Sequence, residues 1–424
     1  MSDRLGRDAA PASLAIDNLR AVVILLVVAF HSVLAYLASL PPHPFPFDSP
    51  PFLWRSFPIV DSERWLGFDL FCAWLDVFLM SFFFLLSGLF TWPSLTRKGA
   101  RGFLVDRVRR LAVPFAVVVL LLMPLAHYPA FMQTAAEPGI ADFCWHWLAL
   151  PLWPSGPVWF LWLLFVGDVA AAGLFQLMTG HRDAVVRRSL HAREHPAKFL
   201  AGFVLAGLLA YIPLALAFGP SAWVQGGPFS LQLSRPLHYA LYFFAGVAIG
   251  ACGIERGLIA ADGPLARRWP RWLVAALLLF PLWLGLTAAT MDRPGSVSLG
   301  LEILDDLSFA LACFTSCFFV LALAMRFARA RGSLLDSLCG NAYGMYLVHY
   351  GFVVWLQFAL LGILLPAILK ATIVFAGALT LSWSASAALR RVRPIAEILG
   401  GARHAPPARL PPALVPSRSA GLAD

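Results

Sequence analysis

The first long apolar segment of the chain determines how the rest is interpreted. Residues 17–40 read DNLRAVVILLVVAFHSVLAYLASL, and beyond Arg20 the segment has no acidic or basic side chain other than His31. A bilayer core about 30 Å thick needs about 20 apolar residues in a helix. The segment is long enough to cross such a core, so it predicts a membrane-spanning helix at 21–40.

The remaining sequence has the same apolar character. Of 424 residues, 60% are hydrophobic and only 13% are charged, with a mean hydropathy of +0.75. Soluble domains carry about one quarter charged residues, so an ordinary soluble enzyme is excluded. We predict an all-α, polytopic integral membrane bundle of about ten transmembrane helices, the other nine lying near 66–92, 111–132, 158–178, 199–218, 236–252, 271–291, 305–326, 342–362 and 366–389.

Basic residues alternate between the connections of these predicted spans. The chain has 32 Lys and Arg against 23 Asp and Glu, and 27 of the 32 fall in segments expected on one side of the membrane. Cytoplasmic connections are enriched in Lys and Arg, so both termini are predicted to be cytoplasmic. The net charge of +9 is therefore read as a topology signal rather than as a nucleic-acid site.

The domain organisation follows from these spans. We expect a cytoplasmic N-terminal segment at 1–14, the ten-helix domain at 15–392, and a disordered cytoplasmic tail rich in Pro and Arg at 393–424. The six cysteines lie mostly in apolar segments without ligand spacing, so neither a disulfide framework nor a metal site is predicted.

The predicted external connection 133–157 is rich in Trp and Pro, including Trp145, Trp147 and Trp153. Two interpretations are open. The tryptophans can form an interfacial aromatic belt, or the connection can dip back into the bundle and line a cavity with stacking faces suited to sugars.

His31 is the first candidate for a functional residue. It lies eleven residues after Arg20, which is roughly 16 Å along a helix and close to three complete turns. Arg20 at the cytoplasmic border and His31 near the midplane therefore share one face, and Asp17 joins it a turn below. Ionisable residues at membrane depth are functional candidates, and a neutral imidazole can act as a general base or a nucleophile.

Other polar residues extend this picture. Arg107 and Arg110 are neighbours on a helix before the third span, where they either determine topology or hold an anionic group such as phosphate. Within the predicted spans lie Asp76, Asp168, Tyr346 and His349. Each alone can be an interhelical hydrogen-bonding group. Together with His31 they predict a polar cavity open to the cytoplasm.

These motifs resemble the membrane-bound acyltransferase-3 family, and they occur in matching order over roughly 14–390. The family's Arg, ten residues, His motif is matched by Arg20 and His31, and its Arg-x-x-Arg motif by Arg107 and Arg110. Three further stretches resemble it: Phe82-Phe83-Phe84-Leu85-Leu86-Ser87-Gly88, Val158-Trp159-Phe160-Leu161 and Tyr346-Leu347-Val348-His349. One branch often reads His-His where this chain has His349-Tyr350, so the branch is left open.

The resemblance implies an O-acyltransferase of the bacterial inner (plasma) membrane. It would move an acetyl or succinyl group from cytoplasmic acyl-CoA to a hydroxyl of an extracytoplasmic carbohydrate or glycolipid, such as a glucan or O-antigen, with no tightly bound cofactor and no nucleic-acid partner. His31 and Arg20 would be catalytic, and the phosphates of acyl-CoA would be held by Arg107, Arg110 and Arg20. The residues expected to contact substrate are Trp159, Tyr346, His349 and Asp76.

Two other classes of protein are compatible with buried acids and histidines. A transporter or flippase could use them as a proton relay, but such folds often show paired Gly- or Pro-interrupted helices in two halves, and the sequence has no such pairing. A non-catalytic membrane scaffold explains the polar residues at membrane depth poorly. The acyltransferase interpretation is therefore preferred.

Overall fold

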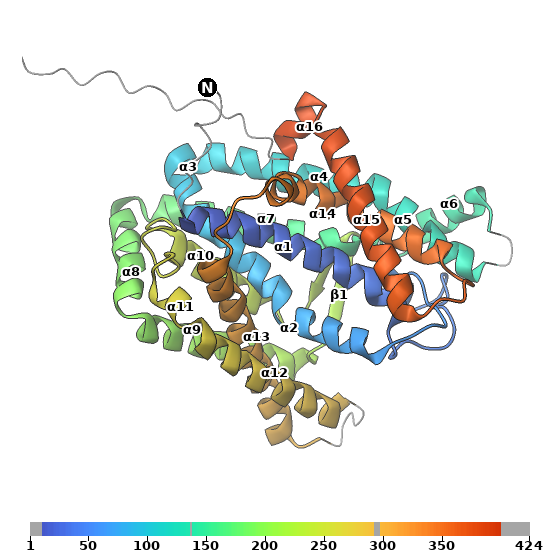
Figure 1. The fold of residues 1–424 in the computed structure, drawn as a ribbon, viewed down its shortest axis with the longest axis horizontal. Coiled ribbons are helices and arrows are strands. Elements are labelled where there is room, and N and C mark those ends of the chain that lie inside the picture. Colours follow the sequence, from blue (N-terminus) through green and yellow to red (C-terminus); the bar gives the residue numbers. More distant parts are fainter. Residues whose placement is uncertain (1–10, 136–137, 292–296, 400–424) are drawn as a thin grey trace, which may run out of the picture.

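A computed structural model describes residues 11–135, 138–291 and 297–399 (Figure 1). The described chain is almost entirely helical, with one antiparallel hairpin, β1 (Trp223–Gly226) and β2 (Phe229–Gln232). The helices are α1 (Pro11–Val33), α2 (Leu66–Leu89), α3 (Thr91–Arg107), α4 (Val113–Val117), α5 (Met123–Thr134), α6 (Ile140–Ala149), α7 (Trp159–Leu177), α8 (Arg182–Glu194), α9 (Pro196–Phe218), α10 (Pro236–Gly250), α11 (Pro264–Arg267), α12 (Trp269–Met291), α13 (Leu299–Phe327), α14 (Ser333–Ala359), α15 (Ala367–Leu389) and α16 (Arg393–Ile398).

The prediction of an all-α polytopic bundle is confirmed. Eight helical segments within the described residues are long and apolar enough to cross a membrane. The two other predicted spans also form helices. One is α10, which is shorter at 15 residues, and the other is α14, a continuous helix of 27 residues that includes the polar residues His349 and Gln357.

The boundaries of the predicted domain need two corrections. The first span does not continue to residue 40, because α1 ends at Val33 and the buried residues Leu34–Tyr36 form a short 3-10 turn. The predicted tail begins with the helix α16 rather than with disordered chain, since Pro394 is preorganised for a first helical turn and Leu399 is buried. The predicted segment 1–10 and the rest of the tail, 400–424, lie outside the described residues.

One continuous helical segment runs from α3 to α5 and contains the third predicted span. Two wide π turns interrupt it, Val108–Ala112 and Val118–Leu122, and each stands just before a proline, Pro114 or Pro124. Proline lacks an N–H and clashes with the carbonyl one turn earlier, so a wider preceding turn accommodates it. The segment also bends at Gly99, whose φ of 69° favours glycine.

Helices α2 and α10 approach each other closely through glycines. A Cβ atom built on Gly88 would collide with the carbonyl oxygen of Phe243, and one built on Gly246 or Gly250 would collide with a carbonyl oxygen of α2. Gly246 and Gly250 form a Gly-x-x-x-Gly pair, the spacing that lets membrane helices pack backbone to backbone. Gly88 belongs to the Ser-Gly stretch noted in the sequence, so close packing explains that glycine.

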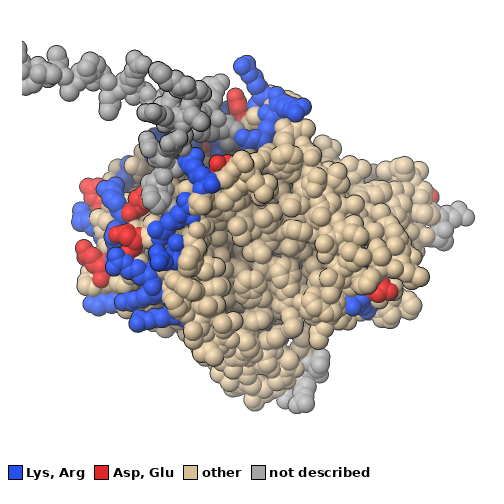
Figure 2. Space-filling model, in the orientation of Figure 1, with Lys and Arg blue, Asp and Glu red and all other residues tan. Residues whose placement is uncertain are grey.

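Charged residues gather at one end of the molecule, as Figure 2 shows. This basic end is formed by the described segments 93–110, 179–198 and 253–271, which include α3, α8 and α11 at the same end of the molecule (Figure 1). In the view of Figure 2 the remaining face is largely uncharged, as expected for a surface in contact with lipid. These three segments were predicted to share one side of the membrane.

The irregular segment that follows α1 is fixed by a buried ion pair. Lys370 of α15 donates to both carboxylate oxygens of Asp61 at 2.9 and 2.8 Å, and each residue is only 1% exposed. The backbone N–H of Asp61 also donates to the carbonyl oxygen of Ala35. The segment between α1 and α2 is therefore part of the packed bundle.

Replacing Gly246 by Val is expected to lower the free energy of unfolding by about 3 kcal/mol, at the upper end for overpacking, because two backbones must move apart. Thermal unfolding in detergent measures the effect. Gly202→Val on α9 is the matched control, since a Cβ there meets nothing within 4 Å. Equal stability of the two variants would contradict the glycine contact.

Candidate functional site

The two histidines singled out in the sequence contact each other. His31, near the end of α1, and His349 of α14 lie with their rings 5.0 Å apart, and Nε2 of His349 is 3.3 Å from Nδ1 of His31. His349 is fully buried, whereas His31 is half-buried. The exposed part of this pair therefore belongs to His31.

Main-chain carbonyls determine which ring nitrogens carry protons. Nδ1 of His31 lies 2.8 Å from the carbonyl oxygen of Val27, and Nδ1 of His349 lies 2.7 Å from that of Tyr346. A carbonyl oxygen only accepts hydrogen bonds, so each Nδ1 must be the donor. In the neutral rings both Nε2 atoms then have a free lone pair. The lone pair of His349 Nε2 faces the N–H of His31, and that of His31 Nε2 has no hydrogen-bond partner among the residues that the structure describes.

The end of α1 is held by a residue that the sequence analysis did not single out. Gln357 of α14 donates from Nε2 to the carbonyl oxygens of His31 at 2.9 Å and Ser32 at 3.2 Å. The last carbonyls of a helix have no partner within the helix. Gln357 therefore allows α1 to stop inside the protein, with His31 in its final turn. A glutamine eight residues after His349 was the available sequence signal.

A second residue missed by the sequence analysis is His127. It is fully buried in α5, and its Nδ1 donates to the carbonyl oxygen of Met123. The ring of Tyr350 lies between the two histidines, 5.4 Å from His31 and 5.7 Å from His127. A histidine inside the apolar run 111–132 was the clue that could have found it.

Arg55 lies beside these aromatic rings in the segment between α1 and α2. Its backbone carbonyl accepts a hydrogen bond from the hydroxyl of Tyr350 at 3.4 Å, and its guanidinium donates to Gln225 of β1. Burial lowers the pKa of the Arg55 guanidinium, but an arginine stays protonated at neutral pH. The main chain of Arg55 therefore contacts the aromatic rings, while its permanent cation is held at the hairpin.

The predicted arginines lie together at the basic end. The charge of Arg20 interacts with those of Arg107 and Arg110 as well as with Asp17, whose carboxylate is 4.0 Å from it. Arg20 lies over the ring of Phe90 at 5.6 Å.

Asp168 positions one of these arginines. Its carboxylate is 1% exposed, lies 3.1 Å from Nε of Arg107, and accepts a hydrogen bond from Thr91 at 3.4 Å. The terminal guanidinium nitrogens of Arg107 have no hydrogen-bond partner among the described residues. They are available to another anion.

The other residues predicted to contact substrate make different contacts within the protein. Tyr346 donates its hydroxyl to the carbonyl oxygen of Pro157 at 2.7 Å and stacks on His349. The ring of Trp159 lies 5.5 Å from that of Trp223 at the hairpin. Asp76 is paired with Arg235 through two hydrogen bonds, of 2.6 and 3.2 Å. Only Tyr346 and His349 are thus grouped with His31, and the substrate contacts of all four stay predictions.

The two interpretations of the external connection 133–157 stay open, and its tryptophans divide between the interior and the surface. Its helix α6 buries Trp147 against His127 and Trp54, with ring centroids 5.8 and 6.4 Å apart. Trp145 on the same helix is 75% exposed. The connection therefore lines the interior on one face and presents an aromatic side chain to the surroundings on the other.

A set of possible metal ligands lies elsewhere. Ligand atoms of His191, Glu194 and His195 are within 4.8 Å of one another at the junction of α8 and α9, and all three residues are exposed. The sequence analysis predicted no metal site and did not select these residues. None of them contacts His31 or His349 in the hydrogen bonds and ring contacts described above.

The arrangement defines a polytopic membrane protein with a pair of contacting imidazoles, one buried and one half-buried, and an arginine cluster. A profile of one protein family, described as an acyltransferase domain, matches residues 13–387. Since this is most of the chain, the protein belongs to the membrane acyltransferase-3 family and is a membrane acyltransferase. Comparison with curated proteins and with solved structures finds no match.

Replacing Asp168 by Leu is expected to cost about 3–5 kcal/mol of stability, because the Arg107 guanidinium would lose its buried counter-charge. Asp168→Asn, which can still accept a hydrogen bond from Thr91, should cost less. Unfolding in detergent measures both. A leucine variant as stable as the unmodified protein would show that the pair does not hold α3 to α7.

Proposed function

We propose that this protein moves an acyl group from acyl-CoA, bound at the basic end, to a hydroxyl of a carbohydrate or glycolipid reaching the opposite side of the bundle. The observation that carries the proposal is His31. Its Nδ1 proton is committed to the Val27 carbonyl and faces His349, so its Nε2 is a free base inside a membrane acyltransferase.

The arginines at the basic end support acyl-CoA as the donor. Coenzyme A carries several phosphate groups, which cannot enter hydrocarbon and which arginine binds with paired donors. Arg20, Arg107 and Arg110 are close enough for their charges to interact. Eleven residues of α1 separate Arg20 from His31, a rise of roughly 16 Å, and an extended pantetheine arm has a comparable length.

Two routes are compatible with a free Nε2. In the first, His31 takes the proton of the acceptor hydroxyl while the oxygen attacks the thioester carbonyl. The C–S bond then breaks, and the proton passes to the leaving thiolate to give coenzyme A. In the second, Nε2 attacks the thioester first, and the hydroxyl later takes the acyl group from the imidazole. Either route forms one ester and releases one thiol.

In this mechanism His349 is a positioning residue. When His31 takes a proton at Nε2 it becomes an imidazolium, and its Nδ1–H becomes a stronger donor. The lone pair of His349 Nε2, 3.3 Å away, stabilises that charge and keeps the ring oriented. An orienting group behind a catalytic histidine is a recurring arrangement in acyl-transfer sites.

The orientation of the bundle follows the charge distribution. Since cytoplasmic connections are enriched in Lys and Arg, the basic end is assigned to the cytoplasm of a bacterial inner membrane, with both termini on that side. An acceptor such as a glucan or O-antigen would then approach from the side of α6 and the hairpin, where Trp159, Trp145 and Arg55 offer stacking faces and a cation. Acetyl and succinyl groups are the acyl groups proposed.

The proposal is tested with detergent-purified protein and a panel of acyl-CoAs, by following release of free thiol with and without candidate glycans. His31→Ala is expected to lower transfer by at least about 100-fold, the range for a lost general base, and to leave thermal stability nearly unchanged. His181→Ala, an exposed histidine outside the site, is the matched control.

Thiol release that needs His31 and increases with one acceptor would establish the donor and the acyl group together. Unchanged turnover in His31→Ala would overturn the assignment of the base. Absence of thiol release from every thioester tested would overturn acyl-CoA as the donor and favour a transport function for the same polar groups.

The role of His349 predicts a graded response in the same assay. His349→Leu removes the acceptor facing His31 and is expected to lower kcat by about 10–100-fold, the range for orienting partners, with little change in KM. His349→Gln can present an amide oxygen to the same N–H and should recover part of the loss. Equal kcat values for the two variants would show that the lone pair has no function.

A further inference from the structure

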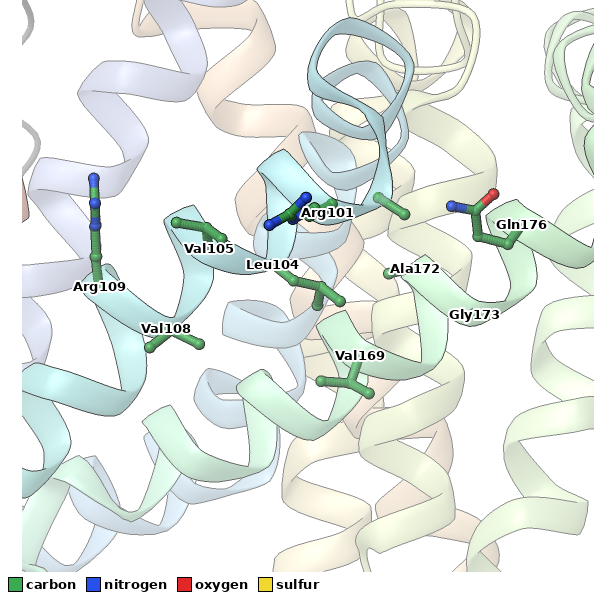
Figure 3. Close-up of a pocket in the computed structure, with 10 residues that line it drawn as sticks. Arg101, Leu104, Val105, Val108, Arg109, Val169, Ala172, Gly173 and Gln176 are labelled. Atoms are coloured by element: carbon green, nitrogen blue, oxygen red, sulfur yellow. The ribbon is translucent and has the colours of Figure 1, made fainter.

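A surface groove lies between α3 and α7, on the side of α3 away from the site described above. It has a volume of about 640 Å³, within the range of small-molecule pockets, and Figure 3 shows it in close-up. Two facing helical stripes form it, and seven of its ten lining residues are apolar or glycine. The lining residues are Ala100, Arg101, Leu104, Val105, Val108, Arg109, Val169, Ala172, Gly173 and Gln176.

The floor of the groove consists of small residues. Ala100 and Ala172 are buried, and a Cβ atom built on Gly173 would meet nothing within 4 Å. The walls carry the valines 105, 108 and 169, which are 46%, 42% and 44% exposed. Exposed valines on the outer face of a membrane helix contact lipid rather than water, so the groove opens toward the bilayer.

Two arginines stand on this same outer face. Arg101 and Arg109 line the groove with the valines, and both are exposed. Figure 3 shows their guanidinium groups and the amide of Gln176 extending to the same side, with Val108 and Val169 below. No ion pair is formed by either arginine within the described residues, and the nearby Asp106 is already paired with Lys98.

The apolar wall continues beyond the arginines toward the middle of the bundle. The exposed side chains Val113, Val117, Leu120, Leu121 and Leu125 follow along α4, the second π turn and α5. From 113 to 125 the helix rises roughly 18 Å, which exceeds the hydrocarbon depth of one leaflet, about 15 Å. A polar end with two cations thus adjoins an apolar path as long as a lipid chain.

We infer that this groove binds an anionic phospholipid of the leaflet at the basic end. Its phosphate lies beside Arg101, which stands between Gln176 and Arg109 in Figure 3, and one acyl chain rests on Gly173 and the valines, passes Arg109 and follows the strip toward Leu125. The inference is independent of the proposed acyl transfer, since Arg107 turns inward to Asp168 while Arg101 and Arg109 face the groove. Basic pockets between membrane helices commonly select anionic headgroups in this way.

The expected change in lipid affinity follows from the charges of Arg101 and Arg109. A Lys or Arg near a membrane surface attracts anionic lipid by about 1 kcal/mol, which is about a fivefold change in affinity. Removing both arginines should therefore weaken binding of an anionic lipid by about 30-fold and leave binding of a zwitterionic lipid nearly unchanged.

The experiment uses the full-length protein, delipidated in a mild detergent and titrated with palmitoyl-oleoyl phosphatidylglycerol or with the corresponding phosphatidylcholine. Native mass spectrometry counts the bound lipids and gives their dissociation constants. One phosphatidylglycerol is expected to bind at least about tenfold more tightly than phosphatidylcholine. The double variant Arg101→Gln, Arg109→Gln should lose this preference, and Gly173→Leu should block the groove to both lipids.

Two matched control variants distinguish a specific lipid site from general effects of charge and of side-chain size. Arg97→Gln with Arg188→Gln removes the same charge from exposed positions at the basic end, and Gly202→Leu adds the same bulk at another open glycine. Both should bind phosphatidylglycerol within about twofold of the unmodified protein. A loss equal to that of the groove variants would overturn the inference.

Two other results would also overturn it. Equal affinity for the two lipids in the unmodified protein would mean that the arginines select no headgroup. Displacement of phosphatidylglycerol by added coenzyme A would mean that the groove belongs to the donor site rather than to a lipid. Because no arm of the experiment measures acyl transfer, failure here leaves the proposed function unaffected.

Discussion

The hydrocarbon core of a membrane offers no hydrogen-bond partner, so each polar group at that depth must find one within the protein. Burial inside the protein imposes the same requirement on charged groups, and it accounts for the long-range polar contacts of the bundle. Lys370 pairs with Asp61, Arg235 with Asp76 and Arg107 with Asp168, and each pair joins segments far apart in the sequence. Breaking such a pair is costly, so these contacts fix how the helices are arranged as well as how the charges are satisfied.

The same constraint explains how a base can stand inside the bundle. Helix α1 ends within the protein, where the carbonyls of its last turn would lack partners, and Gln357 supplies them. His31 lies in that turn with one ring nitrogen bound to its own helix, and the other has no hydrogen-bond partner within the described part of the chain. A free lone pair held at a fixed position, beside a second imidazole, is the arrangement that general-base or nucleophilic catalysis needs. The same few contacts thus supply hydrogen-bond partners to the end of α1 and hold His31 in a reactive state.

The helical segment formed by α3 and the following π turn carries arginines with two different surroundings. Arg107 turns inward to a buried carboxylate, while Arg101 and Arg109 face outward over a groove lined by valines. In the sequence these residues form one basic run, which the positive-inside tendency alone would explain. Their division between two faces of one helix separates a proposed donor-binding function from a proposed lipid contact, and it makes the two separately testable.

The sequence by itself determined the properties that depend on local composition and period. Apolar runs of membrane length predicted the helices, and the spacing of Arg20 and His31 placed them on one face of α1. It could not supply contacts made across the bundle: His349 meets His31 from 318 positions away. His127 and Gln357 are visible as polar residues in apolar runs, but the sequence does not show what they contact. Nor did it show that Asp76, a predicted substrate contact, also pairs with Arg235. Only the tertiary structure decided these contacts between helices. Helix packing sets which helix faces meet, and the hydropathy of a segment does not specify which residues its side chains contact.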